Sequence, residues 1–403
     1  MPEMSPPAPP IGQYVRFWRE KRQRTQVAIA GLIGITEEYL SQIERGLKTP
    51  SLQVLHALAK ELGVPISALL GEAPSEYDSS DITVAPSVTH ALMGYGPSAS
   101  SEPLAPAALR EGVESAWRMW QTSRTRFTEA ASLLPGLIVE TEHAVRIHRI
   151  GSDIATRRET LRVAADLYFM LRSYCRRAGR VDLSLMVADR ALRAAEDADD
   201  PVRIAVAQWN LGHVLLGDGE YEGAEQVALL GIEHLRDELR SKHTAAMTGA
   251  LELVAVVADA RRKRWWKARD RLRDQAMLRA REVGEGNVGW TVFGPTNVQL
   301  HWLNIEMEAG EAAEALRVAN QIDTSRLPSL ERRFTFLLEV ARCHDLRRED
   351  TAVLVHLLDL EEMAPEDLAR SPAAHNMVAR LRRRAHRTYQ RQVNGLAERL
   401  NIL

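Results

Sequence analysis

The stretch TQVAIAGLIGITEEYLSQIERG, residues 25–46, constrains the fold of this 403-residue chain more than any other segment. Apolar residues recur at helical spacing on both sides of Gly34, and glycine tolerates the positive φ that a tight turn requires. A threonine stands directly before each helical segment, where its hydroxyl can accept a hydrogen bond from a free N–H of the first turn. The pattern predicts two short helices, 26–33 and 37–45, joined by a tight turn.

The inner faces of these two helices follow from the same spacing. Apolar side chains three and four positions apart lie on one face of a helix. Four of them would join the two helices, and a small alanine would let the helices approach closely. These residues are Ile29, Ile33, Leu40, Ile43 and Ala30. The opposite faces are left free for contacts with another molecule.

The longer pattern T-Q-x-x-I-A-x-x-x-G-I-T-x-x-Y-L-S-Q-I-E-R-G-x-K-x-P-S-L resembles the repressor-type helix-turn-helix domain, the XRE family that includes Cro and the phage repressors. The resemblance covers residues 11–71 and implies five helices around one small core, with the other three over 11–22, 51–62 and 65–70. It also implies sequence-specific binding to a double-stranded DNA operator and a role in transcription regulation. In such domains the second helix of the motif enters the major groove.

The resemblance indicates which side chains contact DNA. Some are expected at phosphates, where the N-terminus of the first motif helix adds its backbone N–H groups. Others can bond to base edges, although two adjacent acids would repel phosphates, so at least one is expected to serve only the helix dipole. The alternative for each residue is ordinary surface polarity. The expected residues are Gln26, Arg45 and Lys48 at phosphates, and Thr36, Glu37, Glu38, Tyr39, Ser41 and Gln42 on the base-reading helix.

Charge is distributed unevenly along the chain. The net charge of the whole chain is −2, whereas residues 11–71 hold eight basic and five acidic residues and so carry +3. A cationic segment is attracted to DNA phosphates. The excess of positive charge is small, so it supports the DNA-binding motif but would not by itself indicate DNA binding.

Targeting signals and cysteine usage indicate the compartment. The first ten residues, MPEMSPPAPP, lack the basic and apolar parts of a signal peptide and are predicted to be a disordered tail. No run of eighteen apolar residues exists, so no transmembrane helix is expected. Two cysteines far apart, Cys175 and Cys343, give no disulfide framework and fit a reducing environment. We expect a cytoplasmic protein.

Residues 72–103 differ from the segments on either side. Proline, serine and glycine are dense there and helical periodicity is absent, so this segment is predicted to be a flexible linker. From residue 104 to residue 403 the sequence is almost entirely helical in pattern, with proline and glycine mainly at the joints. The sequence therefore predicts an all-α protein in which a five-helix DNA-binding domain is tethered to a larger helical domain.

The larger domain contains internal repeats. The clearest unit, residues 209–235, resembles the tetratricopeptide (TPR) repeat through its pattern N-L-G…G-x-Y-x-x-A. Weaker copies over 155–370 place a small residue where two helices would cross, at spacings longer than the ~34 residues of an ideal unit. Such units stack into a solenoid, because none can bury its apolar face alone. The small residues are Gly212 and Ala224 in the clear unit and Ser184, Ala268, Ala315 and Ala352 in the others. After the repeats, residues 371–400 are predicted to form a terminal amphipathic helix.

The concave face of this TPR-like solenoid is predicted by placing Gly212 at the crossing. A polar stripe in the fourth unit follows helical spacing, and asparagine supplies both a donor and an acceptor. These side chains could hold a peptide or a polar small molecule; a solvated groove or a satisfied network between helices is the alternative. The candidate effector-binding residues are Trp209, Asn210, His213, Asn297, His301, Asn304 and Glu308.

No catalytic signature is present in the sequence. It contains no phosphate-binding loop, no HExxH, no GxSxG and no paired Cys/His spacing for a metal, so no enzyme activity, cofactor or metal is expected. The combination of a helix-turn-helix domain and a TPR-like solenoid resembles the peptide-pheromone-responsive regulators of Gram-positive bacteria. We expect a regulator whose solenoid senses an effector and forms a homodimer; the alternative is an adaptor, or a regulator controlled by a protein partner.

Overall fold

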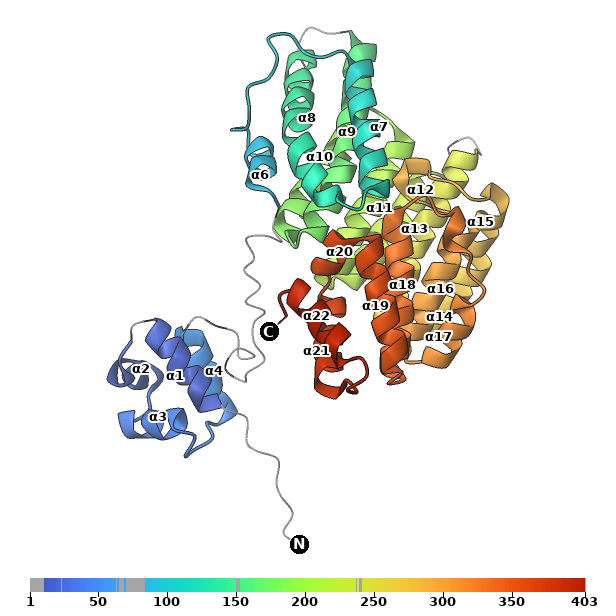
Figure 1. Cartoon of the computed structure of the whole chain (residues 1–403). Coiled ribbons are helices and arrows are strands. Elements are labelled where there is room, and N and C mark those ends of the chain that lie inside the picture. Colours follow the sequence, from blue (N-terminus) through green and yellow to red (C-terminus); the bar gives the residue numbers. More distant parts are fainter. Residues whose placement is uncertain are drawn as a thin grey trace. The chain divides into compact units, whose positions relative to one another are not determined.

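The computed structural model describes residues 11–22, 24–62, 64, 69, 84–149, 153–236, 238 and 241–402. Throughout these ranges the regular secondary structure is helical and no strand is present, as the sequence predicts. The chain divides into two compact units, residues 1–81 and 82–403, which are described separately. Figure 1 shows the helices of both units. Within the described ranges, every helix is too short or too polar to cross a lipid bilayer.

The first unit contains four described helices around a small core. They are α1 (Ile11–Lys21), α2 (Gln26–Ile33), α3 (Glu37–Glu44) and α4 (Leu52–Leu62). Val15, Leu40 and Leu58 are fully buried where α1, α3 and α4 meet, and Ile29 of α2 completes this core. Most of the predicted fifth helix and all of the predicted disordered tail lie outside the described residues.

The second unit begins earlier than the sequence predicts. Residues 72–83 of the predicted linker lie outside the described residues, but residues 84–103 belong to the helical unit. They include helix α6 (Pro86–Leu92), which packs against α8 (Figure 1). Val84, Val88 and Leu92, spaced four apart, are buried in the main core. This short apolar face was missed because the surrounding proline, serine and glycine dominate the local composition.

After α6, the second unit continues with two long helices and then with antiparallel pairs. The helices of its first half are α7 (Pro106–Thr122), α8 (Arg126–His148), α9 (Ile154–Arg177), α10 (Val181–Asp197), α11 (Pro201–Asp218) and α12 (Tyr221–His234). Each helix packs on its successor, and α9 and α11 also contact each other. This stacking of helix pairs gives the solenoid-like arrangement that the repeats predict.

The pairs continue through the second half. Its helices are α13 (Lys242–Arg261), α14 (Trp265–Arg271), α15 (Met277–Val283), α16 (Pro295–Glu308), α17 (Ala312–Ala319), α18 (Leu330–Leu346), α19 (Asp350–Met363), α20 (Pro365–Ala369), α21 (Pro372–Arg384) and α22 (Gln390–Arg399). A π-helical turn, Leu272–Ala276, joins α14 to α15. The predicted terminal helix is therefore wrong: it is split into α21 and α22, because both apolar faces close on one C-terminal core.

Five of the six predicted crossing residues are buried, whereas Ala352, in the first turn of α19, is half-buried. A Cβ atom on Gly212 would be 2.7 Å from Cγ1 of Val254, so the first helix of the clear repeat touches α13 directly. Ala224, Ala268 and Ala315 have no exposed surface, and each begins the second helix of its pair. Ser184 is also fully buried and donates to the carbonyl of Arg172 at 3.1 Å. The repeat assignment thus fixed the pairing of the helices.

The connection between α15 and α16 has an unusual backbone. Trp290 (φ 61°) and Val292 (φ 54°) both adopt the left-handed region that residues with side chains rarely occupy. Asn287 stabilises this turn: its Oδ1 accepts from the Val292 N–H at 3.1 Å and its Nδ2 donates to Gln121 of α7 at 2.7 Å. The indole of Trp290 stacks on Trp117, also of α7, at 5.2 Å and 4°. The loop is thereby attached to α7.

A polar network attaches the start of α8 to the C-terminal helices. The Arg126 guanidinium is fully buried and pairs with Asp367 of α20 and, at 3.6 Å, with Glu331 of α18. Glu366 accepts from the Phe127 N–H at 2.7 Å, which caps the N-terminus of α8. Contacts between α7 and α18 lie next to this network. The first and last parts of the solenoid therefore meet.

Candidate functional site

The motif predicted over residues 25–46 has the expected local geometry. Thr25 accepts from the Ala28 N–H at 3.2 Å, and Thr36 accepts from the Tyr39 N–H at 3.2 Å, so each hydroxyl caps its helix. Gly34 ends α2 with φ 74°, as its position in the turn requires. Ile29, Ala30, Leu40 and Ile43 are buried between the helices and Ile33 is half-buried, in agreement with the pattern.

A buried ion pair fixes the arrangement of the three N-terminal helices. The Arg19 guanidinium of α1 donates to both carboxylate oxygens of Glu44 in α3, at 2.6 and 2.8 Å. Gln26, the first residue of α2, donates to the same carboxylate at 2.7 Å. The hydrogen bond to Glu44 raises the pKa of Arg19, so the guanidinium stays charged. One carboxylate thus holds the start of α2 and the end of α3 to α1.

Gly12 provides a second constraint on α3. A Cβ atom at this position would lie 1.9 Å from the carbonyl oxygen of Ile43. The backbone of α1 therefore approaches the last turn of α3 more closely than any side chain would allow. This contact sets the angle at which α3 is presented on the surface of the unit.

The outer face of α3 carries the predicted base-reading residues. Glu37 and Glu38 are exposed in its first turn, and Tyr39, Ser41 and Gln42 are half-buried. The amide oxygen of Gln42 is covered by protein atoms and has no hydrogen-bond partner. Pairing of both amide atoms with adenine would therefore require this side chain to rotate outwards.

The predicted phosphate-contacting residues surround this face. Arg45 and Lys48 are exposed just after α3, whereas Gln26 is half-buried at the N-terminus of α2. The Lys48 ammonium lies 5.4 Å from the centre of the Tyr39 ring, and Arg45 Nε donates to the Ser41 carbonyl at 3.3 Å. Both cations are thus held beside the outer face of α3 by contacts to residues of that helix.

Comparison with known proteins identifies this unit. A family profile described as helix-turn-helix matches residues 15–69. Residues 15–69 form a helix-turn-helix domain. The immunity repressor of Bacillus phage phi105 is 40% identical over 62 residues, which are 15% of this chain and 43% of the relative. The regulator SinR of Bacillus licheniformis is 37% identical over 70 residues, 17% of this chain and 63% of the relative. The chain thus spans about half of these relatives, which are named as regulators or repressors.

Two solved structures align with the whole chain only loosely. Bacillus thuringiensis PlcR, in complex with the peptide PapR7 and DNA, is 10% identical with a TM-score of 0.32, covering 85% of this chain and 99% of that chain. The competence regulator ComR from Streptococcus vestibularis in its apo form is 11% identical with a TM-score of 0.33, covering 93% and 97%. Both TM-scores are below 0.5.

The second unit contains a cleft of about 520 Å³ on the inner side of its helix pairs. Its walls come from α7, α9, α11, α13, α16 and α18 and from the loop that carries Trp290. Three predicted effector-binding residues line it: Trp209, His213 and Asn304. Trp209 and His213 contact each other edge to face, with ring centres 4.4 Å apart.

The other four predicted effector-binding residues do not line this cleft. Asn210 is buried and uses both amide atoms within the protein, accepting from Arg172 at 2.6 Å and donating to the Val206 carbonyl at 2.8 Å. Asn297 is buried in α16, and Glu308 lies within 4 Å of Arg261 and Arg342. His301 is half-buried. The polar stripe of α16 is thus divided: Asn304 lines the cleft, Glu308 pairs with arginines of neighbouring helices, and the Oδ1 of Asn297 is buried without a hydrogen-bond partner among the described residues.

Sequence reasoning missed the most prominent residues of the cleft, five arginines and three further tryptophans. Arginines are abundant in this chain, and those in the cleft come from three different helices. Their shared location appears only when α9, α13 and α18 are brought together. The missed residues are Arg172, Arg176, Arg177, Arg261, Arg332, Trp117, Trp120 and Trp290.

Burial and neighbouring positive charges lower the pKa values of several residues in and near the cleft. Burial, followed by repulsion from nearby arginines, lowers the pKa of Arg172 to about 9 and that of Arg176 to about 10. Burial and the charge of Arg332 lower the pKa of His301 to about 3, and the pKa of His213 is shifted in the same direction. Both imidazoles are therefore neutral at pH 7, and the arginines carry the charge of the cleft.

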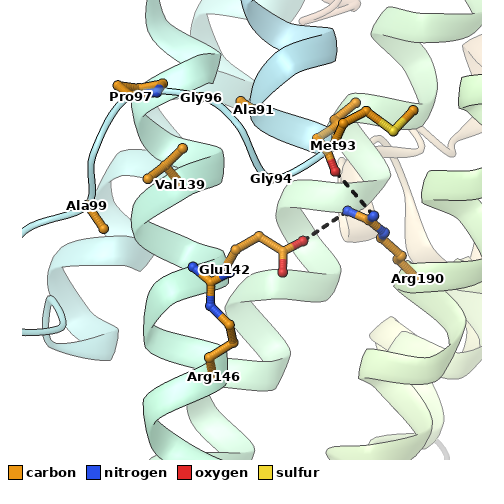
Figure 2. Close-up of a pocket in the computed structure, with 11 residues that line it drawn as sticks. Ala91, Met93, Gly94, Gly96, Pro97, Ala99, Val139, Glu142, Arg146 and Arg190 are labelled. Atoms are coloured by element: carbon orange, nitrogen blue, oxygen red, sulfur yellow. Dashed lines mark hydrogen bonds and ion pairs between the residues drawn. The ribbon is translucent and has the colours of Figure 1, made fainter.

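Two other cavities differ in character. One of about 260 Å³ lies between the loop after α6 and helices α8 and α10 (Figure 2). There Arg190 pairs with Glu142 at 3.0 Å and donates to the Leu92 carbonyl at 3.2 Å, so its charge is satisfied within the protein. The other, about 350 Å³, includes the ion pair Arg203–Asp166 and shares Trp290 with the arginine-lined cleft.

Proposed function

We propose that this protein is a transcriptional regulator that binds duplex DNA through its helix-turn-helix domain. The observation that carries the proposal is the exposed face of α3, which Glu44 and Gly12 hold at a fixed angle to α1. Glu37 and Glu38, at the exposed start of this helix, have acceptors that suit cytosine N4, and Gln42 has an amide that suits adenine. The regulator names of the matched relatives support the same assignment for the domain.

The backbone contacts are assigned to residues around that face. Gln26 and the free N–H groups at the start of α2 would bind one phosphate, and Arg45 and Lys48 would bind others. Such contacts fix register and orientation but carry no sequence information. Thr36 would act through its cap, which fixes the first turn of α3, and the ring of Tyr39 would support Lys48.

We further propose that the regulator acts as a homodimer. One small domain buries little DNA surface, whereas specific sites generally bury ~1,000 Å² or more of protein. Two copies on a two-fold symmetric operator would double the contacts, with half-sites about 34 Å apart. The second unit would supply dimerisation and would bind an effector, a peptide or a small molecule, in its cleft. A ligand that alters the dimer geometry would alter the fit of the two domains to the operator.

A titration of the full-length protein with DNA from upstream of its own gene tests the DNA-binding proposal. Fluorescence anisotropy at several salt concentrations should show sequence-selective binding that weakens steeply with salt. Gln42→Ala should reduce discrimination between sequences, whereas Lys48→Ala should weaken binding to all sequences. Gln53→Ala and Lys60→Ala, at exposed positions of α4, are the matched controls. If Gln42→Ala and Lys48→Ala both left sequence-selective binding unchanged, the assignment of the outer face of α3 to DNA would be overturned.

A further inference from the structure

The charges of the cleft are not balanced by its own carboxylates. Its two acidic residues already have partners: Glu331 pairs with Arg177 of the cleft and lies 3.6 Å from Arg126, and Glu339 pairs with Arg342 at 2.9 Å. Arg261 is paired with Glu308 at 3.3 Å. Three arginines remain. Among the described residues, no carboxylate lies within ion-pair distance of Arg172, Arg176 or Arg332, although all three line the same cavity.

These three guanidiniums come from two helices that face each other. Arg172 and Arg176 are one turn apart on α9, so they point to the same side, and Arg332 projects from the first turn of α18. Arg172 is only 5% exposed, and the one hydrogen bond that its guanidinium makes to another described residue runs from Nε to Asn210. The remaining N–H groups of a buried guanidinium need acceptors, because an unpaired buried charge is costly.

Aromatic side chains cover the neighbouring walls. Trp209 lies 5.4 Å from the Arg172 guanidinium, and Trp120 and the stacked pair Trp117–Trp290 line the same space. Flat apolar rings beside a group of cations suit a ligand that has both a planar or apolar part and a negative charge. A volume of about 520 Å³ lies in the range of sites for small ligands.

We propose that the effector of this regulator is an anion whose carboxylate or phosphate group is held by Arg172, Arg176 and Arg332 and whose apolar part lies against the tryptophans. This inference rests on the proposed sensing role of the second unit and specifies its ligand class. Guanidinium groups match carboxylate and phosphate oxygens in pairs of parallel hydrogen bonds, which makes arginine better suited than lysine to this role. The neutral His213, which also lines the cleft, adds a hydrogen-bonding group.

Three probes that share one ring test the ligand class: phenyl phosphate, phenylacetate and the neutral phenylacetamide. Their binding to the full-length protein is measured by calorimetry and by quenching of tryptophan fluorescence, at probe concentrations up to about 10 mM. We expect at least one anion to bind and the amide to bind at least about tenfold more weakly, with the stronger anion indicating a phosphate or a carboxylate source. Equal binding of amide and anions, or no binding of either anion, would overturn the proposal.

Variants on α18 localise the site. Arg332→Gln should weaken anion binding at least about tenfold, whereas Arg332→Lys, which keeps the charge, should retain part of the affinity. Arg383→Gln, an exposed arginine of α21, is the matched control and should leave binding unchanged. If the Arg332→Gln variant folds and binds the anion as tightly as the unmodified protein, the anion binds elsewhere and the proposal is contradicted.

DNA affinity is measured on the same samples without probe. Intact DNA binding with no anion binding would overturn this inference and leave the DNA-binding proposal standing. Anion binding at the arginines without any DNA binding would support this inference and overturn the DNA-binding proposal.

Discussion

Arg126 and Asp367 form an ion pair in the interior of the second unit although 241 positions separate them in the chain. This pair joins the start of α8 to α20, and through Glu331 it also reaches α18, one wall of the arginine-lined cleft. The cleft therefore depends on a contact between the two ends of the helical unit. Its shape is set by the whole solenoid and not by a single repeat.

Asp367→Ala should destabilise the second unit by about 3 kcal/mol or more, because removing one partner leaves the fully buried Arg126 charge poorly compensated. Urea unfolding followed by circular dichroism measures the change. Glu361→Ala breaks the partly exposed pair Arg399–Glu361 and is the control, with an expected change of at most about 1 kcal/mol. Equal effects of the two substitutions would contradict a structural role for the buried pair.

Gly12→Ala should disrupt the helix-turn-helix domain, since its Cβ would lie 1.9 Å from the carbonyl oxygen of Ile43 and neither backbone can move away alone. We expect a loss of about 3 kcal/mol or more, faster hydrogen exchange over residues 11–62, and loss of DNA binding. Gly31→Ala is the matched control: no atom lies within 4 Å of that Cβ, so alanine should stabilise α2 by up to about 1 kcal/mol.

The second unit should lose stability as the pH falls from 7 to 5. Burial and Arg332 lower the pKa of His301 to about 3 in the folded protein, whereas an unfolded histidine titrates near 6.5. Between these values the unfolded chain binds more protons, so the free energy of unfolding decreases with falling pH, by at most about 1.4 kcal/mol per pH unit for one histidine. His301→Gln should flatten this slope. The exposed His386→Gln is the control, and equal slopes in both variants would refute the assignment.

Asn287→Ala should release the loop that carries Trp290. The substitution removes the acceptor for the Val292 N–H and the donor to Gln121, so two residues in left-handed conformations lose their support. We expect a loss of about 1–3 kcal/mol and a weaker near-ultraviolet signal from the stacked pair Trp117–Trp290. Asn320→Ala, at an exposed position after α17, is the control. An unchanged tryptophan signal in Asn287→Ala would show that other contacts hold the loop.

The helix-turn-helix domain was predictable because its determinants are local. Thr25, Gly34 and Thr36 act on backbone groups within a few residues, and the apolar spacing of α2 and α3 shows which faces are buried. The repeat in the second unit was predictable for a similar reason: Gly212 and Ala224 mark helix crossings in any such pair. Local patterns therefore gave the fold class and the helix pairing.

The cleft could not be predicted in the same way. Asn210 and Asn297 have the residue type and spacing of groove residues, but both side chains are buried, and the amide of Asn210 bonds to Arg172 of α9. The grouping of Arg172, Arg176 and Arg332 depends on a contact between α9 and α18 across more than 150 positions. No periodicity within one helix carries that information.

Trp290 lines two cavities at once, the arginine-lined cleft and its smaller neighbour beside α7. The position of this one residue thus affects the walls of both cavities. A ligand that moved Trp290 on entering one cavity would therefore change the lining of the other.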